Sequence, residues 1–261
     1  MRKKGAVDGK PLFRTITRRP NRLFAIGDIH GCISELEVLL EYLEGVLSFS
    51  KEDQLIFMGD YVDRGSSSRR VIDRLLAWQE QWTETVFLKG NHEEMFMSFL
   101  GLGGEGGENF LANGGTEALR SYGIDPGSDL NSVQSRMPGT HIEFLKGLEV
   151  GVCLAEFVFV HAGLRPKIAL EKQSYDDCLW IRREFLKAKH NLGKTVVFGH
   201  TAFNNVMVDL PLKIGIDTGV IYGNKLSMVE LVEGGLYQVD FAERDVKVSS
   251  LVELVGGSTE E

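Results

Sequence analysis

The sequence predicts an α/β fold, and three observations support this. Apolar runs typical of strands alternate with helical periodicity between residues 23 and 100, in the order β-α-β-α-β-α. A strand pattern returns between residues 152 and 240. The chain has 261 residues, of which 43% are hydrophobic, enough for one large domain with a sizeable core. Together these features indicate a buried sheet covered by helices.

Three strand–helix pairs make up the first part of the chain. The predicted strands span 23–26, 55–58 and 86–88. Apolar residues at helical spacing predict the following helices over 34–43, 68–78 and 93–100. The segment 34–37 carries a capping-box pattern, Ser34 with Glu37, so we expect the first helix to begin there.

The second part begins with a glycine-rich stretch at 101–107 that satisfies G-x-G-x-x-G. It follows a helix rather than a strand, so it fails the context of a dinucleotide fingerprint and is interpreted as a mobile loop beside the active site. A mostly helical middle follows. Further strands are predicted at 152–160, 196–198 and 214–216, and a hairpin over 226–240 turning at Gly234 and Gly235.

One domain is expected over residues 21–255. Residues 1–20 are rich in Lys and Arg but lack the apolar core of a secretory signal, so they are interpreted as a basic, solvated N-terminal arm. Residues 256–261 are expected to be a disordered tail.

The net charge of −8 and the pI near 5.4 disfavour nucleic acid and anionic membranes as partners. An anionic substrate must then be attracted locally, as bound metal cations would do. Cys32, Cys153 and Cys178 show no CxxC spacing, which favours a reducing compartment, and we expect a cytoplasmic protein. No apolar run reaches the roughly 18 residues that a membrane span requires.

Five motifs rich in Asp, His and Asn each follow a predicted strand. They lie at 27–31, 59–65, 90–93, 161–164 and 199–201. Carboxylate, carboxamide and imidazole ligands without thiolate suit divalent Mn, Fe or Zn, and strand ends direct such side chains into a shared crevice. The motifs therefore predict a dinuclear metal site.

The motifs read Gly-Asp-x-His-Gly, Gly-Asp-x-Val-Asp-Arg-Gly, Gly-Asn-His-Glu, His-Ala-Gly-Leu and Gly-His-Thr. In this order the set resembles the phosphoprotein phosphatase branch of the calcineurin-like metallophosphoesterases, over residues 23–230. Within that branch the chain is most similar to bacterial and phage-type serine/threonine phosphatases. The supporting stretches are 113–115, 179–182 and 216–219. The resemblance implies a metallophosphoesterase sandwich of two mixed β-sheets flanked by helices.

The resemblance also implies two divalent metal ions, with Mn expected and Fe, Zn, Co or Ni as alternatives. It assigns Asp28 and His30 to the first metal and Asp60 to both as a bridge. It assigns the second metal to Asn91, His161 and His200. A hydroxide shared by the metals would attack phosphorus in line, so no phosphoenzyme and no catalytic role for Cys32 are expected.

The catalytic side chains follow from the same resemblance. His92 is expected to be the general acid for the leaving oxygen, with Asp63 orienting it. Arg64 and Arg182 are expected to bind the phosphoryl oxygens, since a guanidinium matches their geometry. The neighbouring Arg183 is interpreted as a solvated helix residue. His141 and His190 lie outside the motifs and receive no role.

Three functions are compatible with these residues. The leading hypothesis is a metal-dependent phosphomonoesterase acting on phosphoserine and phosphothreonine in a phosphoprotein or phosphopeptide. The alternative is a symmetrical diadenosine tetraphosphatase or related nucleotide phosphohydrolase, whose substrate would be a dinucleoside polyphosphate, because the same metal core handles an ester or an anhydride. A catalytically inactive binding protein of the same fold is the third, although every expected ligand is present.

Overall fold

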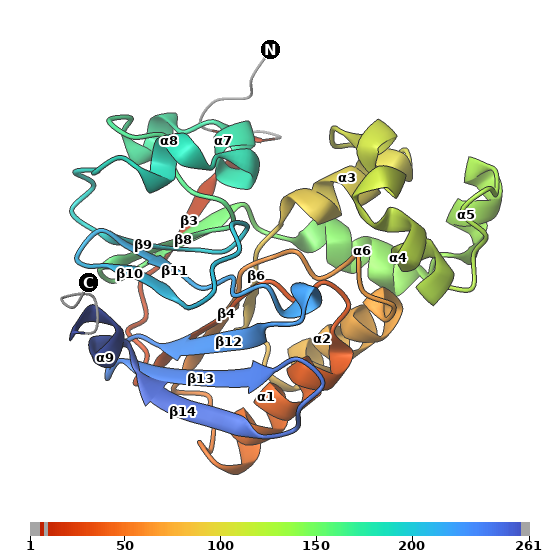
Figure 1. Cartoon of the computed structure of the whole chain (residues 1–261). Coiled ribbons are helices and arrows are strands. Elements are labelled where there is room, and N and C mark those ends of the chain that lie inside the picture. The colour runs from red at the N-terminus through yellow and green to blue at the C-terminus, as the bar shows by residue number, and fades with distance from the viewer. Residues whose placement is uncertain (1–5, 8–9, 257–261) are drawn as a thin grey trace.

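The computed structural model describes residues 6–7 and 10–256. Within that part of the chain, two six-stranded mixed sheets pack against each other and helices cover their outer faces (Figure 1). A small ribbon of β1 (Ala6–Val7) and β2 (Lys10–Pro11) precedes them. The predicted fold class, a sandwich of two mixed sheets flanked by helices, is confirmed.

The first sheet contains the three N-terminal strands of the prediction. From edge to edge its strands are β14 (Val246–Ser250), β13 (Gly235–Asp240), β12 (Lys225–Glu230), β4 (Leu23–Ile26), β5 (Gln54–Phe57) and β6 (Val86–Phe87). β4, β5 and β6 are parallel, so their carboxyl ends lie at one edge. The predicted hairpin is the antiparallel pair β12–β13.

The second sheet is built from the later part of the chain and one early strand. Its strands are β10 (Met207–Asp209), β11 (Lys213–Gly215), β9 (Thr195–Phe198), β8 (Phe157–Val160), β7 (Gly151–Leu154) and β3 (Phe13–Ile16). β8 and β9 are parallel neighbours. Their carboxyl ends therefore also lie together, which places the 161–164 and 199–201 motifs next to each other.

Apolar side chains between the two sheets fix their relative position. One buried cluster joins residues of both sheets. It contains Ala25, Ile56 and Met58 from β4, β5 and the residue after β5, together with Phe159 and Val197 of the second sheet. All five are fully buried. Such dense packing holds the strand ends of both sheets in a fixed arrangement, which a site shared between them requires.

Helices cover both outer faces (Figure 1). α1 (Ile33–Gly45) and α2 (Ser68–Gln81) pack on the first sheet through buried aliphatic residues such as Leu39 and Ile72. α7 (Tyr175–Trp180) and α8 (Arg183–Leu186) pack on the second sheet through Leu179 and Phe185. The amphipathic spacing read from the sequence thus buries one side of each long helix.

The start of the first helix differs from the capping-box prediction. α1 begins at Ile33, after Cys32, without a side-chain cap. Glu35 is buried and its carboxylate accepts a hydrogen bond from the backbone N of Ala242, at 2.8 Å. Ser34 and Glu37 both lie inside the helix, where Glu37 accepts a hydrogen bond from Arg70 at 3.3 Å, so the capping-box interpretation was wrong.

The helices between β6 and β7 lie to one side of the two sheets, at the right of Figure 1. They are α3 (Asn91–Phe99), η1 (Gly107–Asn109), η2 (Leu111–Asn113), α4 (Gly115–Ser121), α5 (Leu130–Arg136) and α6 (Gly139–Gly147). Stacked rings of Phe96 and Phe110, with centroids 4.8 Å apart, join α3 to the segment after η1. The glycine-rich stretch 101–107 runs from the end of α3 into η1, so it lacks the preceding strand of a dinucleotide fingerprint.

Several segments differ from the sequence prediction. Residues 152–160 form two antiparallel strands, β7 and β8, rather than one. Within the expected arm of residues 1–20, Phe13–Ile16 is β3 and pairs with β7, while residues 1–5 and 8–9 lie outside the described residues. Of the expected tail 256–261, only Gly256 is described, as the end of α9 (Leu251–Gly256). Among the described residues, no helix is long and apolar enough to cross a membrane.

Candidate metal centre

The five motifs meet where strand ends of the two sheets converge. Asp28 and His30 follow β4, Asp60 follows β5, and Asn91 begins α3 after β6. From the second sheet, His161 follows β8 and His200 follows β9. All six of these side chains are buried at 6% exposure or less. The sequence prediction that the motifs share one crevice therefore agrees with their positions.

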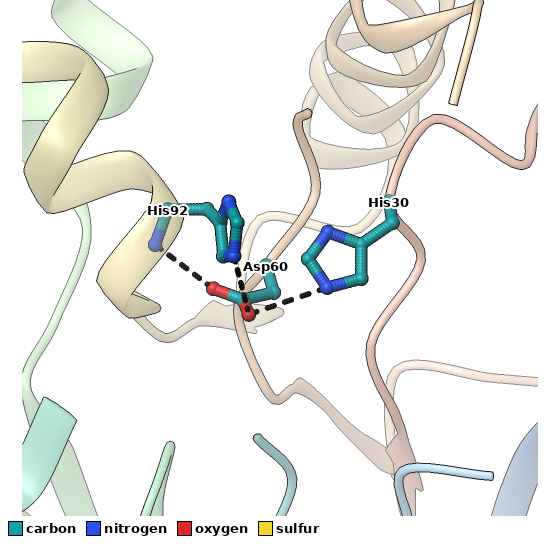
Figure 2. Close-up of side chains that lie close together, drawn as sticks. All are labelled: His30, Asp60 and His92. Carbon is teal, nitrogen blue, oxygen red and sulfur yellow. Dashed lines mark hydrogen bonds and ion pairs between the residues drawn. The ribbon is translucent and has the colours of Figure 1, made fainter. Parts of the chain in front are cut away.

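Asp60 lies between two groups of potential metal ligands. One group, which we call the His30 cluster, contains His30, Asp60 and His92. Its imidazole Nε2 atoms lie 3.4 Å (His30) and 4.0 Å (His92) from Asp60 Oδ2, and Figure 2 shows both rings directed at this carboxylate. The His200 cluster contains Asp60, His161 and His200. Here His161 Nε2 lies 3.4 Å from Asp60 Oδ1.

Asn91 connects the two imidazoles of the His200 cluster. Its side-chain oxygen lies 3.1 Å from His161 Nε2 and 2.8 Å from His200 Nδ1. A carboxamide oxygen accepts hydrogen bonds and also serves as a neutral metal ligand. Asn91 therefore faces the same point as the histidines, as the resemblance implies.

Asp28 belongs to neither cluster but adjoins the second. Its Oδ2 accepts a hydrogen bond from the backbone N of His200, at 2.9 Å. Asp28 Oδ1 and His200 Nε2 are buried, and neither has a hydrogen-bond partner within the described part of the chain. Buried polar atoms rarely stay unpaired unless an ion or water satisfies them. These two atoms and the Asp/Asn/His donor set fit divalent metal ions.

Backbone and carboxylate partners fix the orientation of three imidazoles. His30 Nδ1 donates to Val62 O at 2.9 Å, and His161 Nδ1 donates to Met58 O at 2.8 Å. These bonds leave Nε2 of each ring available as a metal ligand. His92 Nδ1 lies 2.8 Å from Asp63 Oδ2, which leaves its Nε2 facing Asp60.

The two predicted phosphate-binding arginines lie in different surroundings. Arg64 places Nη1 2.6 Å from His30 Nε2. Arg182 is exposed, between α7 and α8. Its charge acts on His200, whose pKa lies well below the ordinary value because of burial, the charge of His161 and then that of Arg182. Arg64 thus contacts the His30 cluster, whereas Arg182 acts electrostatically on the His200 cluster.

The loops that carry the ligands have strained backbones. Positive φ angles occur at His30 (45°), Asp60 (53°), Arg64 (66°) and His200 (62°). Each such non-glycine conformation costs about 1–3 kcal/mol, and such residues concentrate at functional sites. The surrounding packing must therefore hold these loops in place.

Glu93 supports the loops of the first sheet. Its carboxylate accepts hydrogen bonds from the backbone N atoms of Asp60 (2.9 Å), Tyr61 (2.8 Å) and Gly90 (2.9 Å). We assigned no role to Glu93 from the sequence, although it ends the Gly-Asn-His-Glu motif. The signal was its place at the third residue of a helix, where a Glu side chain reaches back to the preceding loop.

Glycine is required where two ligand loops touch. A Cβ on Gly90 would lie 2.0 Å from Asp60 Oδ1, and one on Gly65 would lie 2.1 Å from His30 O. No side chain fits at either position without moving a ligand residue. These glycines of the motifs therefore set the close approach of the loops.

The electrostatics of the centre favour cation binding. Burial alone would raise the pKa of Asp60, but His161, His92 and His30 together hold that pKa well below its ordinary value. Burial lowers the pKa of His30 to about 3, so this imidazole is neutral at pH 7. Burial and the charges of Asp217 and Asp60 raise the pKa of Asp28 well above its ordinary value. An anionic Asp60 beside the neutral imidazole of His30 is a suitable bridge between cations.

Comparison with known proteins identifies the family. The calcineurin-like phosphoesterase family model matches residues 22–224, which include all five motifs. The chain belongs to this family. The predicted calcineurin-like family is thereby confirmed, although its phosphoprotein phosphatase branch is not, and the protein is a metallophosphoesterase hydrolase.

Sequence relatives of this metallophosphoesterase carry one recurrent name. A bis(5'-nucleosyl)-tetraphosphatase PrpE [asymmetrical] of Oceanobacillus iheyensis is 28% identical over 231 residues, covering 80% of this chain and 88% of the relative. The protein of the same name from Anoxybacillus flavithermus is 27% identical over 235 residues, covering 80% and 89%. These names favour the nucleotide alternative over the leading protein phosphatase hypothesis.

A solved structure agrees with these relatives. The "Crystal structure of a putative diadenosine tetraphosphatase" is 25% identical, with a TM-score of 0.63, and the match covers 88% of this chain and 98% of that one. A cold-active protein tyrosine phosphatase also shares the fold, with a TM-score of 0.58, but at 15% identity this likeness concerns the fold alone.

Proposed function

We propose that this metallophosphoesterase hydrolyses a phosphoanhydride bond of bis(5'-nucleosyl) tetraphosphates. The observation that carries the proposal is the similarity, over 80% of this chain, to relatives named for that reaction. The shared Asp60 between two ligand clusters supports it, because two cations suit a polyphosphate substrate. The relatives are named asymmetrical, so we propose unequal products, not the symmetrical cleavage considered from the sequence.

The metal ligands proposed from the family resemblance keep their places in this account. Asp28 and His30 would hold one divalent ion, and Asp60 would bridge to the other. Asn91, His161 and His200 would hold the second ion. Such ions would supply charge neutralisation for the polyphosphate and an activated water at neutral pH. The donor set suits manganese, which we propose as the metal.

His92 is proposed to give a proton to the leaving oxygen. Its ring is held by Asp63 Oδ2 at 2.8 Å, so Nε2 points into the centre. Burial raises the pKa of Asp63 to about 6, while the hydrogen bond from His92 opposes that rise, so this carboxylate is an anion at pH 7. Asp63 thereby orients the imidazole for proton transfer.

Arg64 and Arg182 are proposed to bind the phosphate chain. A guanidinium offers paired N–H donors that match phosphoryl oxygens. Arg64 adjoins His30 of the His30 cluster, and Arg182 acts on His200 of the other cluster. A substrate with several phosphates in a row would use both.

Phosphoprotein hydrolysis remains the second candidate. The motif at 199–201 and the Trp-Ile-Arg stretch ending at Arg182 support it, since both match the phage-type protein phosphatases. The metal centre itself suits either reaction, because an ester and an anhydride need the same in-line attack on phosphorus.

One experiment separates the two candidates. The kcat/KM of manganese-loaded protein is measured on diadenosine tetraphosphate and on a phosphothreonine peptide, with Asp60→Asn as the blank, and the nucleotide products are resolved by chromatography. We expect a strong preference for the dinucleotide, with ATP and AMP as products. A preference for the peptide would reject the proposal, and two ADP molecules would reject asymmetrical cleavage.

A further inference from the structure

Two exposed aromatic side chains flank the metal centre. Trp180 is 43% exposed and Tyr222 is 67% exposed. By contrast, Trp78 of α2 is fully buried in the core. Large exposed aromatic rings next to a polar site have no packing role there, and such rings commonly recognise flat ligands.

Trp180 adjoins the His200 cluster. It is the last residue of α7, and its ring lies 6.4 Å from the His200 ring between centroids, at 84°. It lines an open cavity of about 610 Å³ together with Arg182 and Arg183, and Asp176, Asp177 and Glu184 line the same cavity. The preceding Leu179 is fully buried, so α7 presents the indole from a fixed position. An indole beside guanidinium groups is a suitable site for a nucleotide, whose base is flat and whose phosphates are anionic.

Tyr222 adjoins the other cluster. It is the last residue of η4 (Val220–Tyr222), and the Arg64 guanidinium carbon lies 5.6 Å from its ring centroid. Arg64 in turn contacts His30 at 2.6 Å. Val220 is buried and anchors the short helix, while the Tyr222 ring stays open to solvent. Tyr222 therefore stands by the His30 cluster as Trp180 stands by the His200 cluster.

We propose that Trp180 and Tyr222 are the base-stacking residues for the two nucleosides of a dinucleoside polyphosphate. This inference rests on the proposed function and deepens it. The substrate carries a flat base at each end of its phosphate chain, and the structure carries an exposed ring at each side of the two clusters. Stacking of a base on an aromatic side chain tolerates different bases, so the pair favours nucleotides in general over phosphoproteins.

Tyr222 has a competing role that the test must separate. Its ring also lies over Arg64, so a purely positioning role, in which the ring orients that guanidinium for phosphate, must be distinguished from stacking. Loss of a positioning role weakens every polyphosphate equally. Loss of a stacking role weakens only ligands that carry a base.

The test measures binding instead of turnover. Calorimetry on the manganese-loaded protein gives the affinities for a methylene-bridged analogue of diadenosine tetraphosphate, which resists hydrolysis, and for inorganic tripolyphosphate, which has no base. The variants are Trp180→Ala and Tyr222→Ala. Trp180→Phe and Tyr222→Phe keep a ring, and Val248→Ala is the control, since Val248 is 57% exposed on the edge strand β14.

We expect each alanine variant to bind the analogue about tenfold more weakly or worse, with unchanged tripolyphosphate affinity. The phenylalanine variants and Val248→Ala should bind like wild type. Unchanged affinity for the analogue, equal weakening of both ligands, or no analogue binding by wild type would overturn the inference. If wild type binds the analogue through these rings yet leaves diadenosine tetraphosphate uncleaved, the proposed function fails and the stacking residues stand.

Discussion

The two sheets contribute different chemistry to the metal centre. The second sheet places only two imidazoles there, those of His161 and His200. The first sheet places the carboxylates as well as imidazoles and an amide, from Asp28, His30, Asp60, Asn91 and His92. Among the proposed ligands, negative charge to balance the cations thus comes from the first sheet, while the second sheet's Asp217 acts on Asp28 without being a proposed ligand. Loss of a first-sheet carboxylate should therefore matter more than loss of a second-sheet imidazole.

Backbone strain is divided in the same way. Positive φ angles at His30, Asp60, Asp63 and Arg64 belong to the loops of the first sheet, and His200 is their counterpart on the second. Glu93 binds the backbone of the strained first-sheet loops. The sheet that supplies the charge therefore also depends on a dedicated supporting side chain.

The largest effect is expected for Asp60→Asn. Asp60 is the only carboxylate common to both clusters, so this change weakens both at once. Since each catalytic metal ion contributes several kcal/mol to the transition state, we expect kcat/KM on diadenosine tetraphosphate to fall by about 10³-fold or more. Steady-state kinetics measures this, with Asp245→Asn at an exposed position as the control. Activity within tenfold of wild type would show that Asp60 is not the carboxylate on which both clusters depend.

A smaller effect is expected for Glu93→Gln. The substituted amide presents one NH₂ group to a site where the carboxylate accepts backbone N–H donors, so at least one donor loses its partner. We expect the free energy of unfolding to fall by about 1–3 kcal/mol. Urea unfolding measures it, with the exposed Glu84→Gln as the matched control. Equal midpoints for both variants would show that Glu93 does not support the loops.

A histidine outside both clusters should show the smallest effect, through pH. His141 lies in α6, where Tyr122 Oη donates to its Nδ1 at 2.9 Å and its Nε2 donates to Asp73 Oδ1 at 2.9 Å. Burial lowers the pKa of His141, although Asp73 opposes this. The unfolded chain, with an ordinary histidine pKa of about 6.5, then binds more protons than the folded one.

The stabilisation from neutral His141 is therefore complete above pH about 6.5 and is lost as pH falls through its lowered folded pKa. We expect the free energy of unfolding of metal-loaded wild type to decline more steeply from pH 7 to pH 5 than that of His141→Gln. Urea titrations at several pH values compare the slopes. Parallel slopes would mean that His141 titrates alike in both states.

The part of the fold that sequence predicts is the part whose pattern is strongest. β4, β5 and β9 are buried along their whole length, so they appear as continuous apolar runs. Edge strands β3 and β14 have no fully buried residue, and their mixed composition carries no such signal. Their places are determined by pairing. β3 pairs with β7, which is distant in the sequence, and β14 pairs with β13, whose own strand pattern is weak.

The candidate site also has a part that the sequence predicts and a part that it does not. The meeting of the five motifs was predictable because each motif follows a strand end, and strand ends of a sheet meet at one edge. The roles of the two aromatic residues were not predictable, because a Trp or Tyr at the end of a short helix has no periodicity that reveals what it faces. The position of Trp180 beside His200, and of Tyr222 beside Arg64, depends on loops meeting in space.

The most direct test of the account is the metal content of four proteins, measured by plasma mass spectrometry after manganese loading and dialysis. A centre with two clusters joined by Asp60 predicts about two ions for wild type and about one each for His30→Ala and His200→Ala. Asp60→Asn should retain fewer than either histidine variant. Two ions retained by Asp60→Asn, or a single ion in wild type, would contradict the shared centre.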